Sequence, residues 1–299
     1  MRFGIFKMRF GLSVALATPF ENDGSIALGA MVAQARRSLD AGCTSIALFG
    51  TTGEGCSIGT REREAVLDAM ISGGVAPNQI VAGVLVDAAA DAVDQAGHAL
   101  SKGVRNILLA PPSYFKNVSE DGLFGWYSAV FTLLGDRARD IIVYHIPSVT
   151  MAPLTHSLIA RLRQAFPGVV TGVKDSGGEW GFTEKLLKEH GDLIILIGDE
   201  RHLAQGVRLG GQGAISGVAN FAPREVRRMA VDGQEDQRVV DLVVEMLKYP
   251  VTPAVKSLTA YLTDDPSWLA VRPPLLPITE EGQRKLASAF DALFRSKAA

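Results

Sequence analysis

Cysteine is scarce in this sequence, which has only Cys43 and Cys56 among 299 residues. The two form no CxxC pair and have no histidine pair beside them, which excludes a disulfide framework and a zinc site of the usual spacing. Free thiols of this kind are typical of a reducing compartment, so we expect a cytoplasmic protein. No apolar run approaches the roughly 18 residues of a membrane span. The first residues, MRFGIFKMRFG, lack the apolar core of a signal peptide, and their repeated MRFG makes Met8 a possible start.

An excess of charge of one sign is also missing. The chain has 30 Lys and Arg against 32 Asp and Glu, and 47% of its residues are apolar. This balance gives no electrostatic footprint for nucleic acid or for an anionic membrane. The composition instead favours a large apolar core and a small neutral or acidic metabolite as ligand.

Short apolar runs alternate with amphipathic helical segments along the first three quarters of the chain, with no linker between them. Eight such units predict an α/β fold, a closed (β/α)8 TIM barrel, with a doubly wound open sheet as the alternative. We expect an N-terminal extension at 1–12, the barrel at 13–222 and a C-terminal helical extension at 223–299, with helices at about 223–232, 235–248, 252–262 and 279–296. The eight runs are Ser13–Phe20, Cys43–Gly50, Ile80–Val86, Arg105–Pro112, Ile141–Pro147, Val169–Asp175, Leu193–Glu200 and Gly213–Gly217.

The run VVTGVKD, Val169–Asp175, has the pattern of a buried strand that ends in a lysine. In a parallel barrel the carboxyl ends of the strands carry the active site, and Lys174 lies at such an end. Desolvation disfavours the ammonium form, and a neutral amine is a nucleophile that forms Schiff bases with carbonyl compounds. The alternative is a structural ion pair of Lys174 with Asp175 or Asp199.

Two other strand ends carry polar groups that suit such chemistry. GTTGEG, Gly50–Gly55, offers two hydroxyls and successive backbone N–H donors for a carboxylate, although such a loop is also a common turn. Tyr144 closes another run, and its hydroxyl can donate and accept a proton. Alternation along a strand places Tyr144 and His145 on opposite faces, so only one of them points into the barrel.

Five motifs together resemble one family. The match starts with ALATPF, which ends the first run, and the five motifs GTTGE, PPSY, YHIP, GVKD and GGQGAISGVANFAP follow in order at the strand ends. Over nearly the whole chain this pattern is similar to the dihydrodipicolinate synthase / N-acetylneuraminate lyase family of pyruvate-dependent class I aldolases. The resemblance implies a homotetramer built as a dimer of dimers, and it requires no metal or organic cofactor.

The resemblance also implies roles for individual residues. Lys174 would form the Schiff base with a 2-oxo acid, Tyr144 would be the acid/base beside it, and Thr51 would relay protons to Tyr144. Thr52 and the backbone at Gly53 would hold the carboxylate of the 2-oxo acid. The backbone of Gly198 and Ile215 would line the same pocket.

The family's relay tyrosine, which comes from a neighbouring subunit, is ambiguous here. Counting forward from Pro112 places it at Tyr114, and counting back from Ser119 places it at Phe115. We select Tyr114, because the relay needs a hydroxyl.

Val149 departs from the synthase branch of the family, where an arginine at this position meets the carboxylate of the incoming aldehyde. A missing guanidinium removes a bidentate carboxylate clamp. We therefore expect a lyase or aldolase acting on a 2-oxo acid and an aldehyde, for example of the 2-keto-3-deoxy sugar acid type. The alternatives are a dehydratase of the same family, 4-hydroxy-tetrahydrodipicolinate synthase, a metal- or phosphate-dependent barrel, and a non-catalytic 2-oxo acid binding protein.

Overall fold

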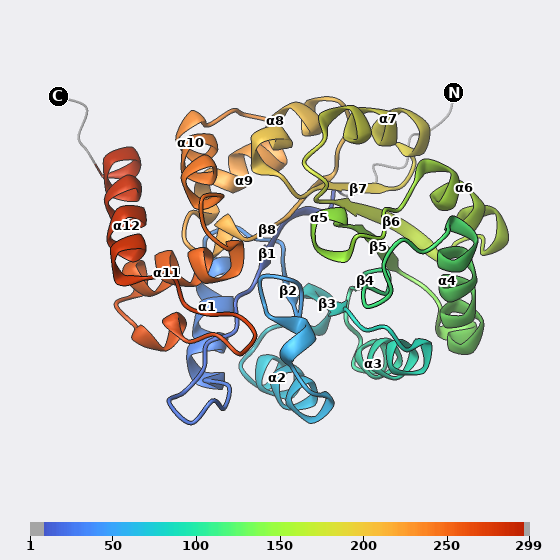
Figure 1. Ribbon diagram of the computed structural model, residues 1–299, viewed down its shortest axis with the longest axis horizontal. Helices are drawn as coiled ribbons and strands as arrows, with labels where there is room; N and C mark the ends of the chain where they lie inside the picture. Colours follow the sequence, from blue (N-terminus) through green and yellow to red (C-terminus); the bar gives the residue numbers. More distant parts are fainter. Residues whose placement is uncertain (1–8, 296–299) are drawn as a thin grey trace.

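The protein is described here from a computed structural model, in which residues 9–295 are defined. Eight parallel strands form a closed barrel, because β1 pairs with β8 as well as with β2 (Figure 1). This confirms the predicted (β/α)8 barrel and excludes the open sheet. The strands are β1 Gly11–Ala15, β2 Ser45–Leu48, β3 Ile80–Val84, β4 Asn106–Leu109, β5 Ile141–His145, β6 Val170–Asp175, β7 Ile194–Ile197 and β8 Gly213–Ser216.

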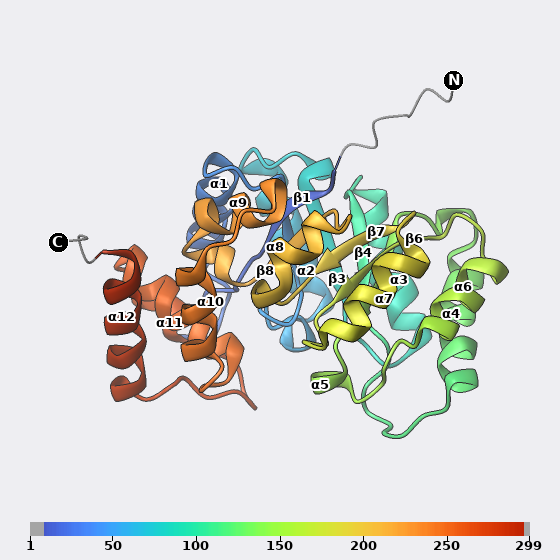
Figure 2. The same ribbon diagram turned by 90° about the horizontal axis from the view of Figure 1, so that it is seen from above.

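Helices follow every strand and surround the barrel (Figure 1). α9 packs against β1 and α8, so it occupies the position of the eighth outer helix. α10, α11 and α12 then gather on one side of the molecule, as Figure 2 shows, close to their predicted ranges. The helices are α1 Leu28–Asp40, α2 Thr60–Ser72, α3 Ala89–Ser101, α4 Glu120–Leu134, α5 Pro147–Thr150, α6 His156–Ala165, α7 Trp180–His190, α8 Glu200–Arg208, α9 Pro223–Asp232, α10 Gln237–Met246, α11 Val251–Thr263 and α12 Glu280–Phe294.

The sequence predicts Thr60 as the N-cap of α2, because acidic residues follow it in what would be the first helical turn. The structure differs from this prediction. Gly59 is the N-cap and Thr60 is the first helical residue. The cap comes from Glu62, whose carboxylate accepts the Gly59 N–H at 2.9 Å. The acidic first turn thus predicted the helix correctly, but the predicted N-cap lies one residue after the observed one.

The strand side chains separate into two apolar layers. One lies inside the barrel and includes Ala47, Ile142, Leu196 and Ile215 together with Tyr144. The other, much larger layer packs between the strands and the helices. Successive residues of a strand alternate between these layers, so only every second residue can reach the barrel interior.

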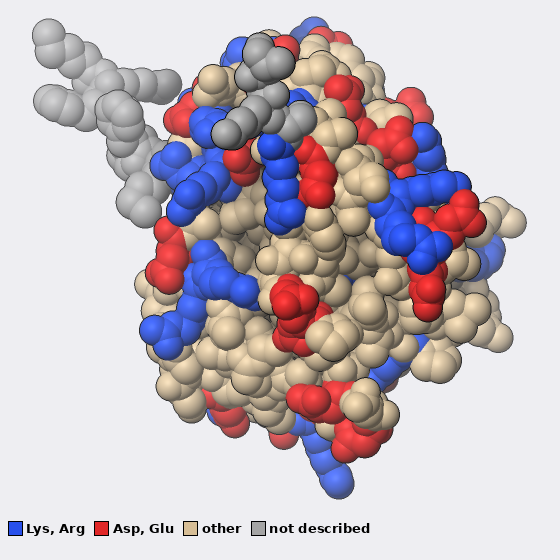
Figure 3. Space-filling model, turned by 90° about the vertical axis from the view of Figure 1, so that its left-hand side faces the viewer, with Lys and Arg blue, Asp and Glu red and all other residues tan. Residues whose placement is uncertain are grey.

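The ends of the chain bear on two further predictions. Met8 and most of the predicted extension at 1–12 lie outside the described residues, and the boundary between 222 and 223 stays a prediction. Within residues 9–295, no helix combines the length and the apolar character needed to cross a membrane. On the face formed by the C-terminal helices, basic and acidic side chains are interspersed (Figure 3).

Candidate active site

Lys174 and Tyr144 lie side by side at the carboxyl end of the barrel. β5 and β6 are neighbours in the sheet, and their register pairs Tyr144 directly with Lys174. The Lys174 Nζ donates a hydrogen bond to the Tyr144 hydroxyl at 3.1 Å and lies 4.2 Å from the centre of the tyrosine ring. Both side chains are almost fully buried. The fold therefore places a buried amine and a phenol in contact.

The carboxylates that were candidates for a structural ion pair with Lys174 are engaged elsewhere. Asp175 accepts hydrogen bonds from the Gly177 N–H at 2.9 Å and the Thr183 hydroxyl at 2.6 Å. Asp199 forms a bidentate pair with Arg201, with its closest contact at 2.6 Å. Among the described residues, Lys174 has a phenol as its partner and no carboxylate. The alternative of a structural ion pair is wrong for both of the residues considered.

The environment of Tyr144 favours proton transfer. Burial alone would raise the pKa of its hydroxyl, but the charge of Lys174 and hydrogen bonds from Thr51, Ser176 and Lys174 outweigh burial, so the pKa lies below its ordinary value. The Thr51 hydroxyl is 3.5 Å from the Tyr144 hydroxyl, and either group can be the donor. Amine, phenol and threonine hydroxyl thus form a continuous chain of groups that can exchange protons.

The loop Gly50–Gly55 delivers both threonines to this chain of groups. Thr51 and Thr52 line the cavity in front of Lys174, which has a volume of about 300 Å³. Gly53 does not line the cavity; its carbonyl accepts a hydrogen bond from the Thr18 hydroxyl at 2.7 Å. A Cβ at position 53 would lie 2.8 Å from the Leu16 carbonyl oxygen. A glycine at this position therefore lets the loop pack closely against the backbone of Leu16.

Two further predicted pocket residues, Gly198 and Ile215, do line the cavity. A Cβ at Gly198 would lie 2.1 Å from the Ser176 hydroxyl and 2.8 Å from the Asp175 carbonyl oxygen. Only a glycine fits there, beside the strand end that carries Lys174. The structure therefore brings six of the eight predicted site residues to one cavity.

Tyr114 is the second exception. It does not line the cavity, and it lies with Phe115 on an exposed loop, where 77% and 73% of these residues are accessible. The Asp87 carboxylate fixes the loop backbone by accepting the Tyr114 N–H at 2.8 Å. Within the described part of one chain, Tyr114 is not a member of the site.

Several cavity residues were not predicted from the sequence. Glu200 opens α8, is 8% exposed, and accepts a hydrogen bond from the Ser216 hydroxyl at 2.6 Å. Burial raises the pKa of this carboxyl, although the Ser216 bond opposes the effect. Its position at the end of the seventh run was the available signal, because strand ends build the site in this fold.

An apolar wall from the C-terminal helices completes the cavity. Its members are Val243, Met246, Leu247, Val251 and Val255. No sequence pattern predicted this wall, because these residues have the spacing of ordinary amphipathic helices. Only the packing of α10 and α11 brings them to the barrel mouth.

The alternation expected at the end of β5 is confirmed. Tyr144 belongs to the interior layer, whereas His145 stacks outside the barrel on Phe182 of α7, with ring centres 4.1 Å apart. The His145 Nδ1 accepts the Leu154 N–H at 3.1 Å. His145 is therefore a packed, hydrogen-bonded histidine.

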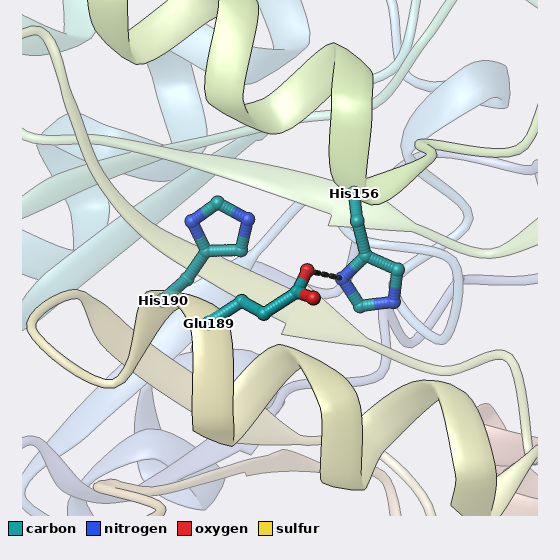
Figure 4. Close-up of side chains that lie close together, drawn as sticks. All are labelled: His156, Glu189 and His190. Atoms are coloured by element: carbon teal, nitrogen blue, oxygen red, sulfur yellow. Dashed lines mark ion pairs between the residues drawn. The ribbon is translucent and has the colours of Figure 1, made fainter.

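A separate cluster on α6 and α7 contains His156, Glu189 and His190, each with one possible ligand atom within 4.8 Å of the others (Figure 4). The guanidinium of Arg163 already lies 2.9 Å from the His190 Nδ1. Burial, reinforced by neighbouring cations, lowers the pKa of both histidines. The guanidinium beside His190 disfavours a second cation at this cluster, and none of its members lines the Lys174 cavity.

A closed parallel barrel with a lysine, a tyrosine and a Gly-Thr-Thr loop at its carboxyl end defines the class of aldolase-type lyases. The comparison with known families agrees: the Dihydrodipicolinate synthetase family matches residues 8–293. The chain belongs to this family, as its motifs predicted.

Individual relatives extend this result. An uncharacterized DapA-like lyase of Chloroflexus aurantiacus is 29% identical, over 95% of this chain and 96% of its own. The crystal structure of a dihydrodipicolinate synthase from Agrobacterium tumefaciens is 65% identical and covers 96% of this chain and 100% of its own, with a TM-score of 0.95. A 2-keto-3-deoxygluconate aldolase variant of Sulfolobus solfataricus shares the fold, with a TM-score of 0.82 at 19% identity and coverage of 95% and 96%.

Proposed function

We propose that the protein is a lyase or aldolase that forms a Schiff base between Lys174 and a 2-oxo acid such as pyruvate. The observation that carries this proposal is the buried contact of 3.1 Å between the Lys174 Nζ and the Tyr144 hydroxyl, with no carboxylate bound to the amine among the described residues. A carboxylate partner would hold the amine in its charged, unreactive form. A phenol can instead pass protons to and from it.

The chemistry follows from these groups. The neutral Lys174 amine attacks the C2 carbonyl of the 2-oxo acid, and Tyr144 protonates the departing oxygen, so that water leaves and an iminium remains. The iminium withdraws electrons, so a proton can leave C3 and an enamine forms there. The enamine attacks an aldehyde carbon, or in the reverse direction the C3–C4 bond breaks and releases the aldehyde. Thr51 returns protons to Tyr144.

The other predicted site residues support binding. We assign the carboxylate of the 2-oxo acid to the hydroxyl of Thr52 and to the backbone N–H groups of the loop residues that line the cavity, Thr51 and Thr52, whose amides follow one another around a tight turn. Tyr114 would complete the proton relay of a neighbouring subunit in a dimer of dimers. Exposed aromatic side chains such as Tyr114 and Phe115 fit a surface that a second copy covers.

We further propose that the partner aldehyde carries no carboxylate of its own, as in 2-keto-3-deoxy sugar acid chemistry. Val149 lines the cavity, and by the motif resemblance it stands where the synthase branch has an arginine. Arg201 also lines it, but its guanidinium is bound in bidentate fashion to Asp199. Neither residue therefore offers a free guanidinium that could bind a second carboxylate in bidentate fashion. An uncharged aldehyde fits the cavity better.

One observation favours a second candidate. The 65% identical Agrobacterium tumefaciens structure is titled a dihydrodipicolinate synthase, so 4-hydroxy-tetrahydrodipicolinate synthase is the alternative. A dehydratase would use the same iminium and expel a C4 hydroxyl from the enamine.

The test is intact-protein mass after incubation with pyruvate and borohydride, followed by peptide mapping. We expect one pyruvate per chain on the wild type, located at Lys174, and none on Lys174→Ala. An adduct at another lysine, or no adduct on the wild type, would overturn the Schiff-base assignment.

Substrate preference is tested separately, by comparing glyceraldehyde with aspartate semialdehyde on the wild type and on Val149→Arg. We expect the wild type to prefer glyceraldehyde and Val149→Arg to shift the preference by about tenfold toward the carboxylate-bearing aldehyde, because one charged contact is gained. A wild type that already prefers aspartate semialdehyde would establish the synthase instead.

A further inference from the structure

The barrel site uses one buried lysine, but the chain contains a second one in α11. Lys256 is completely buried, and its Nζ lies 2.6 Å from the Oε1 of Glu54, whose side chain is also completely buried. Glu54 belongs to the loop Gly50–Gly55 and precedes Lys256 by 202 residues. The ion pair therefore joins the C-terminal helices to the loop that carries Thr51 and Thr52.

Both oxygens of the Glu54 carboxylate are occupied. While Oε1 accepts from Lys256, Oε2 accepts the backbone N–H of Arg272 at 2.8 Å. The Arg272 side chain continues to Glu62 and to the Ser57 carbonyl oxygen. The carboxylate thus bridges three segments that are distant in sequence.

The loop needs such an anchor because its backbone is held in an unfavourable conformation. Phe49 and Glu54 both have positive φ angles, 59° and 54°, which residues other than glycine rarely adopt. Such residues persist only when the surrounding structure fixes them. α11 supplies a second contact one turn before Lys256, where the Thr252 hydroxyl donates to the Thr51 carbonyl oxygen at 3.1 Å.

The charge state of the pair is compatible with this task. Burial lowers the pKa of Lys256 to about 8, against the opposing attraction of Glu54. The attraction of Glu54 thus favours the ammonium form of Lys256 against the effect of burial.

We propose that Lys256 is a positioning residue, whose buried ion pair with Glu54 holds the loop Gly50–Gly55 so that Thr51 and Thr52 serve the Lys174 site. This inference rests on the proposed function. Breaking the pair displaces the loop, so the 2-oxo acid binds less well even though Lys174 and Tyr144 keep their own contacts.

The experiment measures the pyruvate concentration that gives half-maximal borohydride trapping, on folded protein well below its melting temperature. For Lys256→Met we expect this concentration to rise at least about tenfold, because small displacements of binding groups are costly. The matched control is Leu258→Ala, a completely buried core residue of the same helix whose apolar side chain cannot form an ion pair with Glu54. It loses stability but should trap at the wild-type concentration.

Glu54→Gln provides a second variant should Lys256→Met not fold. An amide has one acceptor oxygen, so it cannot satisfy both Lys256 and the Arg272 N–H, and we again expect weaker trapping. If either folded variant reaches half-maximal trapping at the same pyruvate concentration as Leu258→Ala, the proposed role of Lys256 is wrong. Absence of any adduct on the wild type would instead overturn the proposed function itself.

Discussion

The two buried lysines of this protein differ in their partners. Lys174 and Lys256 each lie over an aromatic ring, 4.2 Å from the ring centre of Tyr144 and 4.4 Å from that of Phe20. Lys256 faces the carboxylate of Glu54 and is closed off from solvent, whereas Lys174 faces a phenol and lines a cavity. Burial alone therefore does not distinguish the proposed Schiff-base lysine from a structural one.

The comparison shows what each environment can do. A buried ammonium next to a carboxylate is fixed in place by charge, and removing one partner leaves the other charge uncompensated. A buried amine next to a phenol is not held in an ion pair, and the phenol can pass protons to and from a group that reacts beside it. Four variants test this difference, from the largest expected effect to the smallest.

Lys174→Met should abolish function without costing stability. We expect the exchange of pyruvate methyl protons with deuterated water to fall at least about 10⁴-fold, because the covalent nucleophile is missing. Unfolding in urea should be unchanged or shifted to higher concentration, since methionine fills the same space without a buried polar group. Stability that drops as far as in Lys256→Met would show that the two lysines are equivalent structural residues.

Tyr144→Phe should slow the same exchange by about 10²- to 10⁴-fold, the usual contribution of a positioned acid or base. The adduct should still form on long incubation, because the Lys174 amine is retained. In the wild type the exchange rate should rise with pH through a pKa below 10, since Tyr144 acts as a base only after losing its proton. If Tyr144→Phe shows the same pH dependence, a group other than Tyr144 is responsible for it.

Lys256→Met should reduce the free energy of unfolding by about 3 to 5 kcal/mol, because the Glu54 charge remains buried without its partner. Urea unfolding measures this loss. The double variant Lys256→Met with Glu54→Gln should recover part of it, since no unpaired charge is left. A double variant as unstable as the single one would show that lost packing, and not the uncompensated charge, dominates.

Glu120→Gln measures an exposed ion pair for comparison with the buried one. Hydrogen bonds from Ser157, Thr155 and Arg161 lower the pKa of Glu120 to about 2. Its contribution to stability is thus present above about pH 4.5 and is lost as the pH falls toward 2. Solvent screens this group, so at pH 7 we expect a loss of at most about 1 kcal/mol in urea unfolding, and less at pH 3. An effect as large as that of Lys256→Met would contradict the distinction between the two environments.

Local pattern was enough to predict much of the fold and the centre of the site. Eight apolar runs alternating with helical segments predicted the barrel, because strand and helix periodicities are properties of neighbouring residues. Alternation along a strand likewise placed Tyr144 inside and His145 outside. The lysine at the end of its strand was visible for the same reason.

Two of the missed features of the site depend on residues that are distant in sequence. The partner of Lys174 could not be chosen between Asp175, Asp199 and Tyr144, because that choice depends on strand register and on what else each carboxylate can bind. The wall supplied by α10 and α11 depends on how the C-terminal helices pack against the barrel mouth.

By itself the sequence determined the order of strands and helices, the alternation of strand residues between the barrel interior and the helices, and the motifs that identify the family. The tertiary structure decided which groups meet: Lys174 with Tyr144, and Glu54 with a lysine 202 residues further along the chain. The physical reason is that periodicity acts between neighbours, whereas the partner of a buried charge is set only when the closed barrel and its C-terminal helices exclude water from both groups at once.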